Sequence, residues 1–197
     1  MNQKKIVVFQ GHTDDQSLCR AIADTYEESA KAAGHSVERY NVGELTFDPI
    51  LHNGYRTIQE TEPDLKRFQE SLKNADHFVV IYPNWWSGPP AIVKGFFDRV
   101  WLPGFAYRYI KLSNGTRSPF WHRLMRGKTA RVIVTTGVKP LYLRIMYGNF
   151  VQEVSIAILW FAGFKVEETI FGPSDNPPET IKNTWLAHVR DLASRAR

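Results

Sequence analysis

The chain alternates short apolar runs with segments in which apolar residues recur every three to four positions. The apolar runs are typical of buried or half-buried strands and cover residues 5–9, 37–42, 78–82, 131–136 and 166–171. The periodic segments are typical of amphipathic helices and cover residues 17–33, 63–72, 93–101, 151–161 and 177–192. This alternation predicts a parallel α/β sheet with helices on both faces, and five strands favour the doubly wound order 2-1-3-4-5.

Length and composition fit one globular domain, which we expect to span residues 1–197. Apolar residues make up 43% and charged residues 23%, which excludes a disordered chain and a coiled coil. Cys19 is the only cysteine, so an internal disulfide and a cysteine-based metal cluster are excluded, and no histidine spacing predicts a metal site. We expect a cytoplasmic protein without membrane insertion, because the sequence shows no secretory pattern and no spanning apolar stretch.

The charge balance is mildly basic. The chain has 25 Lys and Arg against 20 Asp and Glu, and the excess lies in residues 108–131 and at the C-terminus. No stripe of Lys and Arg is found, so we do not expect a nucleic-acid partner. An anionic cofactor or an ordinary solvated surface explains the excess equally well.

The strand order predicts where a ligand binds, because doubly wound sheets bind ligands beyond the carboxyl ends of their strands. The segments expected to form this ligand site are residues 10–17, 83–90 and 135–147. The first leads into a helix N-terminus, where backbone N–H groups attract anions and His12 and Thr13 offer further donors. Ser17 or Asp15 is expected to cap this helix. The segment matches neither the P-loop nor the Gly-x-Gly-x-x-Gly pattern.

The other two segments offer surfaces for a planar ligand. Trp85 and Trp86 stand between prolines just after a buried strand, and two adjacent indoles in one turn cannot both point into the core. Residues 135–137, Thr-Thr-Gly, follow the next strand in the predicted sheet. Their hydroxyl and N–H groups can bond the carbonyl edge of a flavin, with Gly137 allowing close approach.

These motifs resemble the flavodoxin-like NAD(P)H:quinone oxidoreductases. The resemblance is carried by Tyr82–Ala91, Lys94–Val100, Gly104–Tyr107, Thr135–Gly137 and Ile158–Phe164 and spans nearly the whole chain. It implies a flavodoxin-like fold, a flavin cofactor (FMN or FAD), NAD(P)H as co-substrate, and a homodimer with two active sites at its interface. A quinone-like small molecule is the implied acceptor.

The resemblance also implies roles for individual residues. His12, Ser17 and Leu18 would hold the flavin phosphates. Five residues of the second segment would lie along the isoalloxazine, although family members usually carry an aromatic residue in place of Ser87: Pro83, Asn84, Trp85, Trp86 and Ser87. Thr135, Thr136 and Gly137 would bind the polar edge of the ring.

The expected reaction is a two-electron, ping-pong hydride transfer from NAD(P)H through flavin N5 to a quinone, in which the flavin performs the chemistry. Tyr147 and Tyr142 are the candidate catalytic residues, since either phenol can stabilise developing charge. The main alternative is a flavin-binding ancillary subunit of a cation-efflux system. A one-electron flavodoxin carrier is disfavoured by the basic composition, and a phosphoacceptor receiver domain by the lack of an acidic pocket.

Overall fold

The computed structural model describes residues 3–57 and 59–197 and contains one parallel sheet and one hairpin. The strands are β1 (Lys5–Gln10), β2 (Ser36–Asn41), β3 (His77–Pro83), β4 (Tyr107–Lys111), β5 (Arg117–Arg123), β6 (Thr129–Thr135) and β7 (Lys165–Phe171). The helices are α1 (Leu18–Ala32), the short η1 (Val42–Glu44), α2 (Pro63–Asn74), α3 (Ala91–Val100), α4 (Pro140–Tyr147), the π-helix η2 (Glu153–Trp160) and α5 (Glu179–Ser194).

The sheet has five strands in the order β2-β1-β3-β6-β7, with every neighbouring pair parallel. This is the order 2-1-3-4-5 once the hairpin strands β4 and β5 are set aside, so the predicted flavodoxin-like arrangement is confirmed. All seven residues of the central strand β3 are buried, as expected for a strand covered on both faces.

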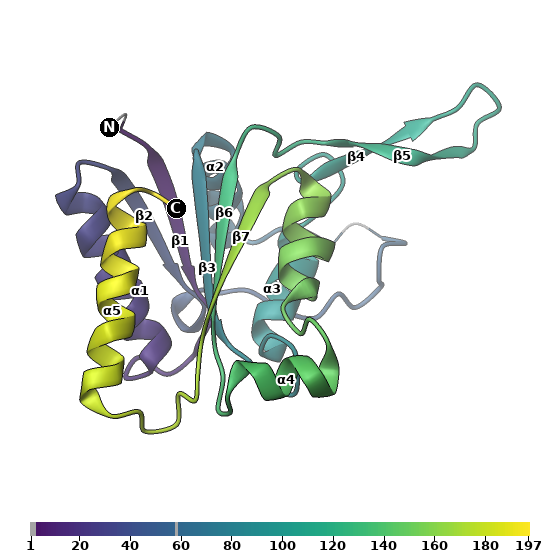
Figure 1. Ribbon diagram of the computed structural model, residues 1–197. Helices are drawn as coiled ribbons and strands as arrows, with labels where there is room; N and C mark the ends of the chain where they lie inside the picture. Colours follow the sequence, from purple (N-terminus) through teal and green to yellow (C-terminus); the bar gives the residue numbers. More distant parts are fainter. Residues whose placement is uncertain (1–2, 58) are drawn as a thin grey trace.

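Helices cover both faces of the sheet (Figure 1). On one face α1 packs beside α5 over Ile6, Val8 and Val79. On the other face α2, α3 and η2 pack over Val7, Phe9 and Phe78. Alternate side chains of each strand therefore contribute to two separate hydrophobic cores, because successive side chains of a strand point to opposite faces.

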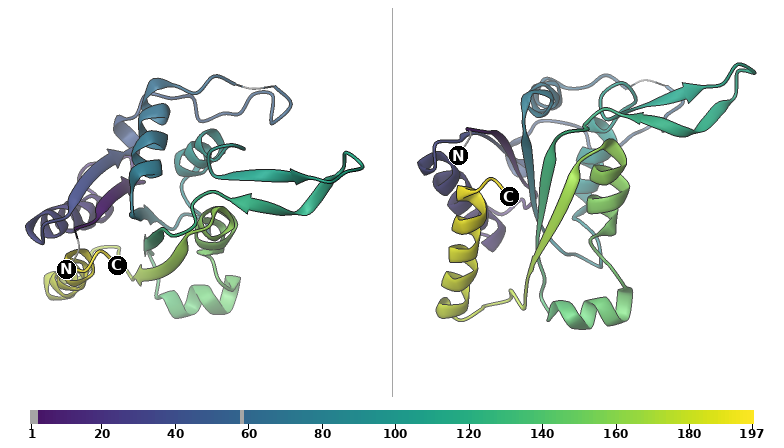
Figure 2. Two further views of the ribbon diagram at one scale, coloured as in Figure 1. Left: turned by 90° about the horizontal axis from the view of Figure 1, so that it is seen from above. Right: turned by 45° about the horizontal axis from the view of Figure 1, so that its top comes forward.

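Two elements were not among the sequence predictions. The β4–β5 hairpin projects far from the body of the molecule, and α4 lies below the sheet beside the ends of the strands (Figures 1 and 2). The segment predicted as an ordinary amphipathic helix at residues 151–161 instead contains the π-helix η2. The helical pattern of residues 177–192 predicts an inner face made by Ile181, Trp185, Val189 and Leu192. In α5, however, Ile181 is exposed, because it lies at the start of the helix beyond the edge of the core.

Among residues 3–57 and 59–197, no helix combines the length and the apolar character needed to cross a membrane.

Candidate functional site

Three loops meet at the carboxyl edge of the sheet, at the bottom of Figure 1. The Gly11 N–H donates to the carbonyl oxygen of Ile81 over 2.7 Å, which joins the end of β1 to β3. The Asn84 N–H donates to the carbonyl oxygen of Thr135 over 2.8 Å, which joins β3 to β6. The predicted convergence of segments 10–17, 83–90 and 135–147 therefore occurs, and it follows from strand order alone.

The first loop is organised by its own side chains. Ser17 caps α1, since its Oγ accepts from the Arg20 N–H at 3.2 Å. The Asp14 carboxylate accepts from the Gln16 N–H at 2.9 Å, and the Asp14 N–H donates to Nδ1 of His12 at 2.9 Å. An anion at this helix N-terminus would therefore compete with the exposed Asp14 carboxylate for loop N–H groups.

A pocket of about 220 Å³ opens beside this loop. It is lined by Gln10, His12, Thr13, Asp15, Arg20, Asn41, Gly43 and Glu44. A hydrogen bond from Arg20 to Glu44, 3.0 Å long, raises the pKa of Arg20, so this cation is charged but already paired. An anion bound here would depend on the loop backbone and on His12 more than on Arg20, because Arg20 is already paired.

The second loop forms a tight turn that presents both indoles to solvent. Trp85 and Gly88 exchange two backbone hydrogen bonds of 2.9 and 3.1 Å. Trp86 and Ser87 between them have φ values of 54° and 64°, so both adopt the left-handed conformation that a type I′ turn requires. The Trp86 side chain is fully exposed at 102%, and Trp85 is 48% exposed. Such strain in two non-glycine residues marks the turn as a functional candidate.

The first and second loops touch through their aromatic rings. His12 and Trp85 lie 5.5 Å apart between ring centroids at an interplanar angle of 79°, an edge-to-face contact. Both of these residues were predicted to contact one ligand, and the structure brings them together. Leu18 is half-buried at the start of α1 and Pro83 is buried at the end of β3.

The third loop turns its hydroxyl groups inward. The Thr136 hydroxyl donates to the carbonyl oxygen of Val138 at 2.7 Å, and the Thr135 hydroxyl lies 3.5 Å from the Cys19 sulfur. Both threonines are buried. Gly137 is exposed, and the Asp175 carboxylate lies against its Cα, where a Cβ would come within 2.7 Å of Oδ2. The surface of this loop is therefore backbone at Gly137, with both hydroxyl groups engaged inside the protein.

The two candidate tyrosines lie on α4 and are exposed, Tyr142 by 55% and Tyr147 by 57%. Residues five apart on an α-helix point about 140° away from each other, because each residue advances about 100°. The Tyr142 and Tyr147 side chains therefore point in different directions, and at most one of them faces a given ligand.

Comparison with known proteins agrees with this architecture. A family model described as a flavodoxin-like fold matches residues 4–193. The chain belongs to this flavodoxin-like family. The resemblance seen in the sequence is thereby confirmed.

Named relatives and a solved structure extend the comparison. NAD(P)H dehydrogenase (quinone) 1 of Rattus norvegicus is 25% identical over 91% of this chain and 73% of its own length. FMN-dependent NADH:quinone oxidoreductase 3 of Bacillus cereus is 29% identical over 72% of this chain and 68% of its own length. The structure of NAD(P)H:quinone oxidoreductase from Methanothermobacter marburgensis superposes with a TM-score of 0.80 at 23% identity, covering 98% of this chain and 97% of that one. This structural likeness shows the same fold.

Two polar side chains at this flavodoxin-like site have buried, unpaired atoms. Gln10 was not among the predicted site residues, and Asn84 was predicted to lie along the ring without a specific hydrogen-bond partner. Gln10 ends β1 and is 1% exposed, and its Nε2 has no hydrogen-bond partner. Oδ1 of Asn84, at the end of β3, is also buried without a partner. One unpaired donor and one unpaired acceptor at this edge fit a polar cofactor there. A glutamine that ends the apolar run Ile6–Phe9 is the sequence signal that identifies the first of them.

Neither a reactive thiol nor a metal cluster is found in the described part of this edge. Burial raises the pKa of the Cys19 thiol to about 12, which makes it a poor nucleophile. Within residues 3–57 and 59–197, no group of three or more His, Cys, Asp or Glu is arranged to hold a metal ion.

Proposed function

We propose that this chain is an NAD(P)H:quinone oxidoreductase that binds a flavin at the carboxyl edge of its sheet. The observation that carries the proposal is the meeting of the His12 loop, the Trp85–Trp86 turn and the end of β6 in a member of the flavodoxin-like family. Relatives named as quinone dehydrogenases and as an FMN-dependent quinone oxidoreductase support the activity and the cofactor.

A bound flavin would supply the two-electron redox chemistry, with NAD(P)H as donor and a quinone as acceptor, each using the same place in turn. The first loop would hold the phosphate group with backbone N–H groups, His12 and Ser17, beside Leu18. The exposed indole of Trp86 offers a flat apolar surface to the ring, and Pro83, Asn84, Trp85 and Ser87 fix the turn that presents it. The buried Oδ1 of Asn84 would gain the hydrogen-bond partner that it lacks.

The third loop would contribute shape more than hydroxyl groups. The Thr135 and Thr136 hydroxyls hold Cys19 and the Val138 carbonyl, which fixes the backbone that leads to Gly137. Gly137 is exposed, so a polar ring edge would approach its backbone on the side that the Asp175 carboxylate does not cover. On α4, either Tyr142 or Tyr147 would hold a proton at its phenol oxygen near a quinone oxygen.

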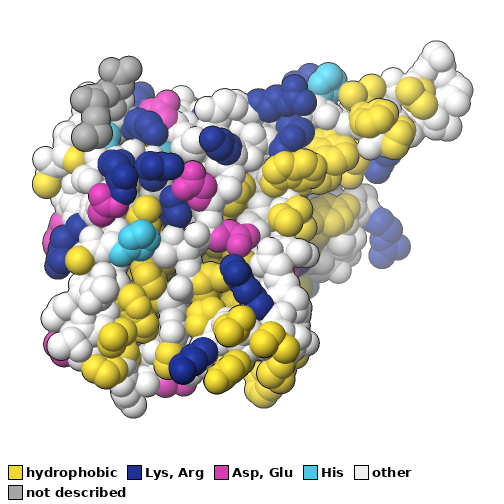
Figure 3. All heavy atoms as spheres, viewed as in Figure 1, with side chains coloured by type: hydrophobic (Ala, Val, Ile, Leu, Met, Phe, Trp, Pro, Cys, Tyr) yellow, Lys and Arg dark blue, Asp and Glu magenta, His cyan; other side chains and the backbone are white. Residues whose placement is uncertain are grey.

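We also propose a homodimer. Four apolar side chains on and before α4 are exposed by 47–74%, and yellow side chains gather over this helix in Figure 3: Val138, Leu141, Ile145 and Met146. A monomer rarely leaves a patch of this kind open to water, and a second copy would cover it. The ancillary-subunit alternative has no comparable observation in its favour.

The decisive experiment follows the absorbance spectrum of the purified protein under anaerobic conditions. We expect flavin bands that bleach with excess NADPH and return with benzoquinone, and release of the flavin identifies FMN or FAD. A protein that stays colourless and cannot be reconstituted with either flavin contradicts the proposal. Fast quinone turnover without a partner protein also counts against the ancillary role as the sole function.

A matched pair of variants localises the site. Trp86→Ala should weaken flavin retention about fivefold, because an aromatic stacking contact contributes on the order of 1 kcal/mol. The melting temperature of the flavin-free form should stay unchanged, because the side chain is fully exposed. Tyr55→Ala removes another exposed ring, 68% accessible and outside the three loops, and should leave flavin retention as it is. Equal retention in both variants would remove Trp86 from the site.

A further inference from the structure

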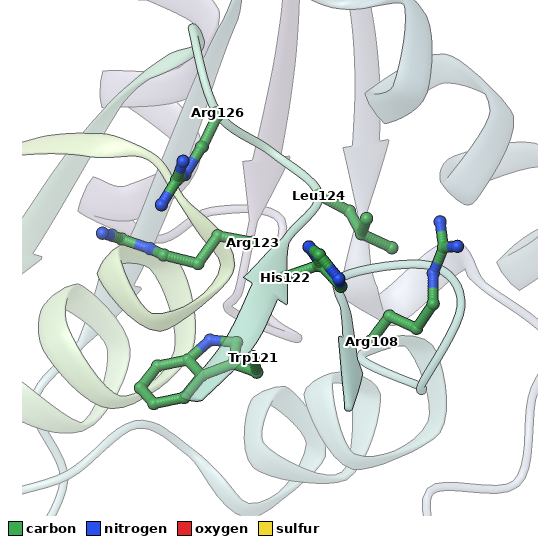
Figure 4. A pocket seen from close by; sticks show the side chains of 6 residues that line it. All are labelled: Arg108, Trp121, His122, Arg123, Leu124 and Arg126. Carbon is green, nitrogen blue, oxygen red and sulfur yellow. The ribbon is translucent and has the colours of Figure 1, made fainter. Parts of the chain in front are cut away.

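A second pocket, of about 360 Å³, lies at the base of the β4–β5 hairpin near the opposite, amino edge of the sheet. It is lined by Arg108, Trp121, His122, Arg123, Leu124 and Arg126. Figure 4 shows the guanidinium groups of Arg123 and Arg126 close together on one flank of β5, with His122 and Arg108 on the other flank. Nothing in the proposed quinone reductase chemistry uses this pocket.

The hairpin is what brings these residues together. Antiparallel pairing sets Arg108 of β4 opposite His122 of β5, although the two are far apart along the chain. Arg126 follows after the strand, where the chain returns to the sheet at the start of β6. Basic residues that form no stripe in the sequence thus line one pocket from both flanks of β5.

Arg123 and Trp121 are held rigidly. The Arg123 guanidinium lies 4.4 Å from the centroid of the Trp160 ring and donates to the Trp160 carbonyl oxygen, while its buried Nε has no partner. The Trp121 indole stacks on Phe161 with ring centroids 4.3 Å apart, and its N–H donates to the Phe161 carbonyl at 2.9 Å. A fixed guanidinium and a fixed ring lose little side-chain entropy when a ligand binds.

The positive charge of the pocket is not neutralised. No Asp or Glu lines it, and no ion pair found among residues 3–57 and 59–197 includes Arg108, Arg123 or Arg126. Burial and the neighbouring charge of Arg126 lower the pKa of Arg123. In the sequence, residues 99–152 hold ten of the 25 Lys and Arg and none of the 20 Asp and Glu. An anion in the pocket would relieve this like-charge repulsion.

We propose that this arginine pocket binds the phosphate group of an organic phosphate ester. Guanidinium groups bind phosphate through paired, charge-assisted hydrogen bonds, and several positive charges favour a doubly charged monoester. The pocket is larger than a phosphate group needs, so the organic part of the ester fits against the wall that Trp121 provides. A soluble ester and a phospholipid headgroup carry the same chemical group and are separated by experiment.

The test uses the full-length protein with its flavin bound and two probes. Calorimetric titration with phenyl phosphate represents a soluble ester. Sedimentation with vesicles of phosphatidylcholine containing phosphatidic acid, against phosphatidylcholine alone, represents a headgroup. Binding of phenyl phosphate assigns a soluble ester, and selective binding to the acidic vesicles assigns a lipid. Binding of neither probe overturns the proposal.

Charge variants connect any binding to this pocket. Arg108→Gln and Arg126→Gln replace side chains outside the core and should each weaken binding of the active probe about tenfold. Arg190→Gln removes another exposed arginine, on α5, and should leave binding unchanged. Equal losses in all three variants would mean attraction to net charge alone and would overturn the assignment.

Discussion

The two edges of the sheet carry two candidate sites of different kinds. At the carboxyl edge, loops from three distant parts of the chain meet because all five strands run in the same direction, and their residues are aromatic, polar and internally hydrogen-bonded. At the amino edge, one hairpin assembles an arginine pocket by local antiparallel pairing. The first site follows from the topology of the fold, whereas the second depends on a segment inserted between α3 and β6.

The two edges also differ in whether their arginine side chains are paired with carboxylates. Arg20 at the carboxyl edge is paired with Glu44 at 3.0 Å, and Asp14 and Asp15 lie in the same loop. Arg108 and Arg126 at the amino edge have no such counterions on the pocket wall. Changes in charge or protonation should therefore affect binding or stability mainly at the amino edge. Substitutions that alter the backbone conformation should have their main effect at the carboxyl edge.

The largest expected effect is an acid-dependent loss of stability at the amino edge. Burial, with the positive charges of Lys4 and Arg131 nearby and a smaller contribution from His35, lowers the pKa of His77 to about 3. The unfolded chain takes up this proton below about pH 6.5, so stability is complete above that pH and falls as the pH drops toward 3. Between pH 7 and 4.5 this one group should lower the free energy of unfolding by about 2–3 kcal/mol.

Urea unfolding of one histidine variant checks this prediction. His77→Gln cannot take up the proton, so its stability should fall by about 2–3 kcal/mol less than that of the parent over the same pH interval. A pH profile of the variant identical to that of the parent would show that His77 is not held neutral by its surroundings.

The same contrast explains what could be read from the sequence. Buried strands such as Phe78–Tyr82 are uninterrupted apolar runs, so their positions and the edge where their loops meet were predicted correctly. The hairpin strands carry Arg108, Lys111, Arg117 and Arg123, and a register shift between Tyr109 and Lys111 interrupts their alternation. Only the Asn114–Gly115 turn signals the hairpin locally.

The directions in which side chains point were also not predictable from the sequence. The sequence places Thr135 and Thr136 at the correct edge, but only packing shows that their hydroxyls serve Cys19 and the Val138 carbonyl. Helix α4 was missed because Leu143 is its only buried apolar residue and the others are exposed, so they give no pattern of a buried stripe.

A second prediction tests backbone shape at the carboxyl edge with a matched glycine pair. A Cβ on Gly11 would come within 2.7 Å of the Val93 side chain and 3.1 Å of the Ile81 carbonyl oxygen, so Gly11→Ala should cost about 2 kcal/mol and weaken flavin retention. A Cβ on Gly88 would meet only the Glu153 carboxylate, at 3.4 Å, so Gly88→Ala should cost much less. Thermal unfolding and flavin retention measure both, and equal costs would contradict the close approach at Gly11.

The smallest expected effect is a gain in stability at the indole turn. Ser87 has a φ of 64°, which glycine adopts without the steric cost that a Cβ imposes. Ser87→Gly should therefore raise the free energy of unfolding by about 0.5–1 kcal/mol, after the greater freedom of glycine in the unfolded chain is subtracted. Ser113→Gly in the hairpin loop is the matched control, because Ser113 is not among the described residues with positive φ, and it should be neutral or destabilising.

The sign of this difference decides how the turn works. If Ser87→Gly is more stable but retains flavin less well, the left-handed serine costs stability while it fixes the direction of the Trp86 indole. If stability rises and flavin retention is unchanged, the two hydrogen bonds between Trp85 and Gly88 alone hold the turn in place. A loss of stability would show that the Ser87 side chain contributes a contact worth more than the strain of its backbone.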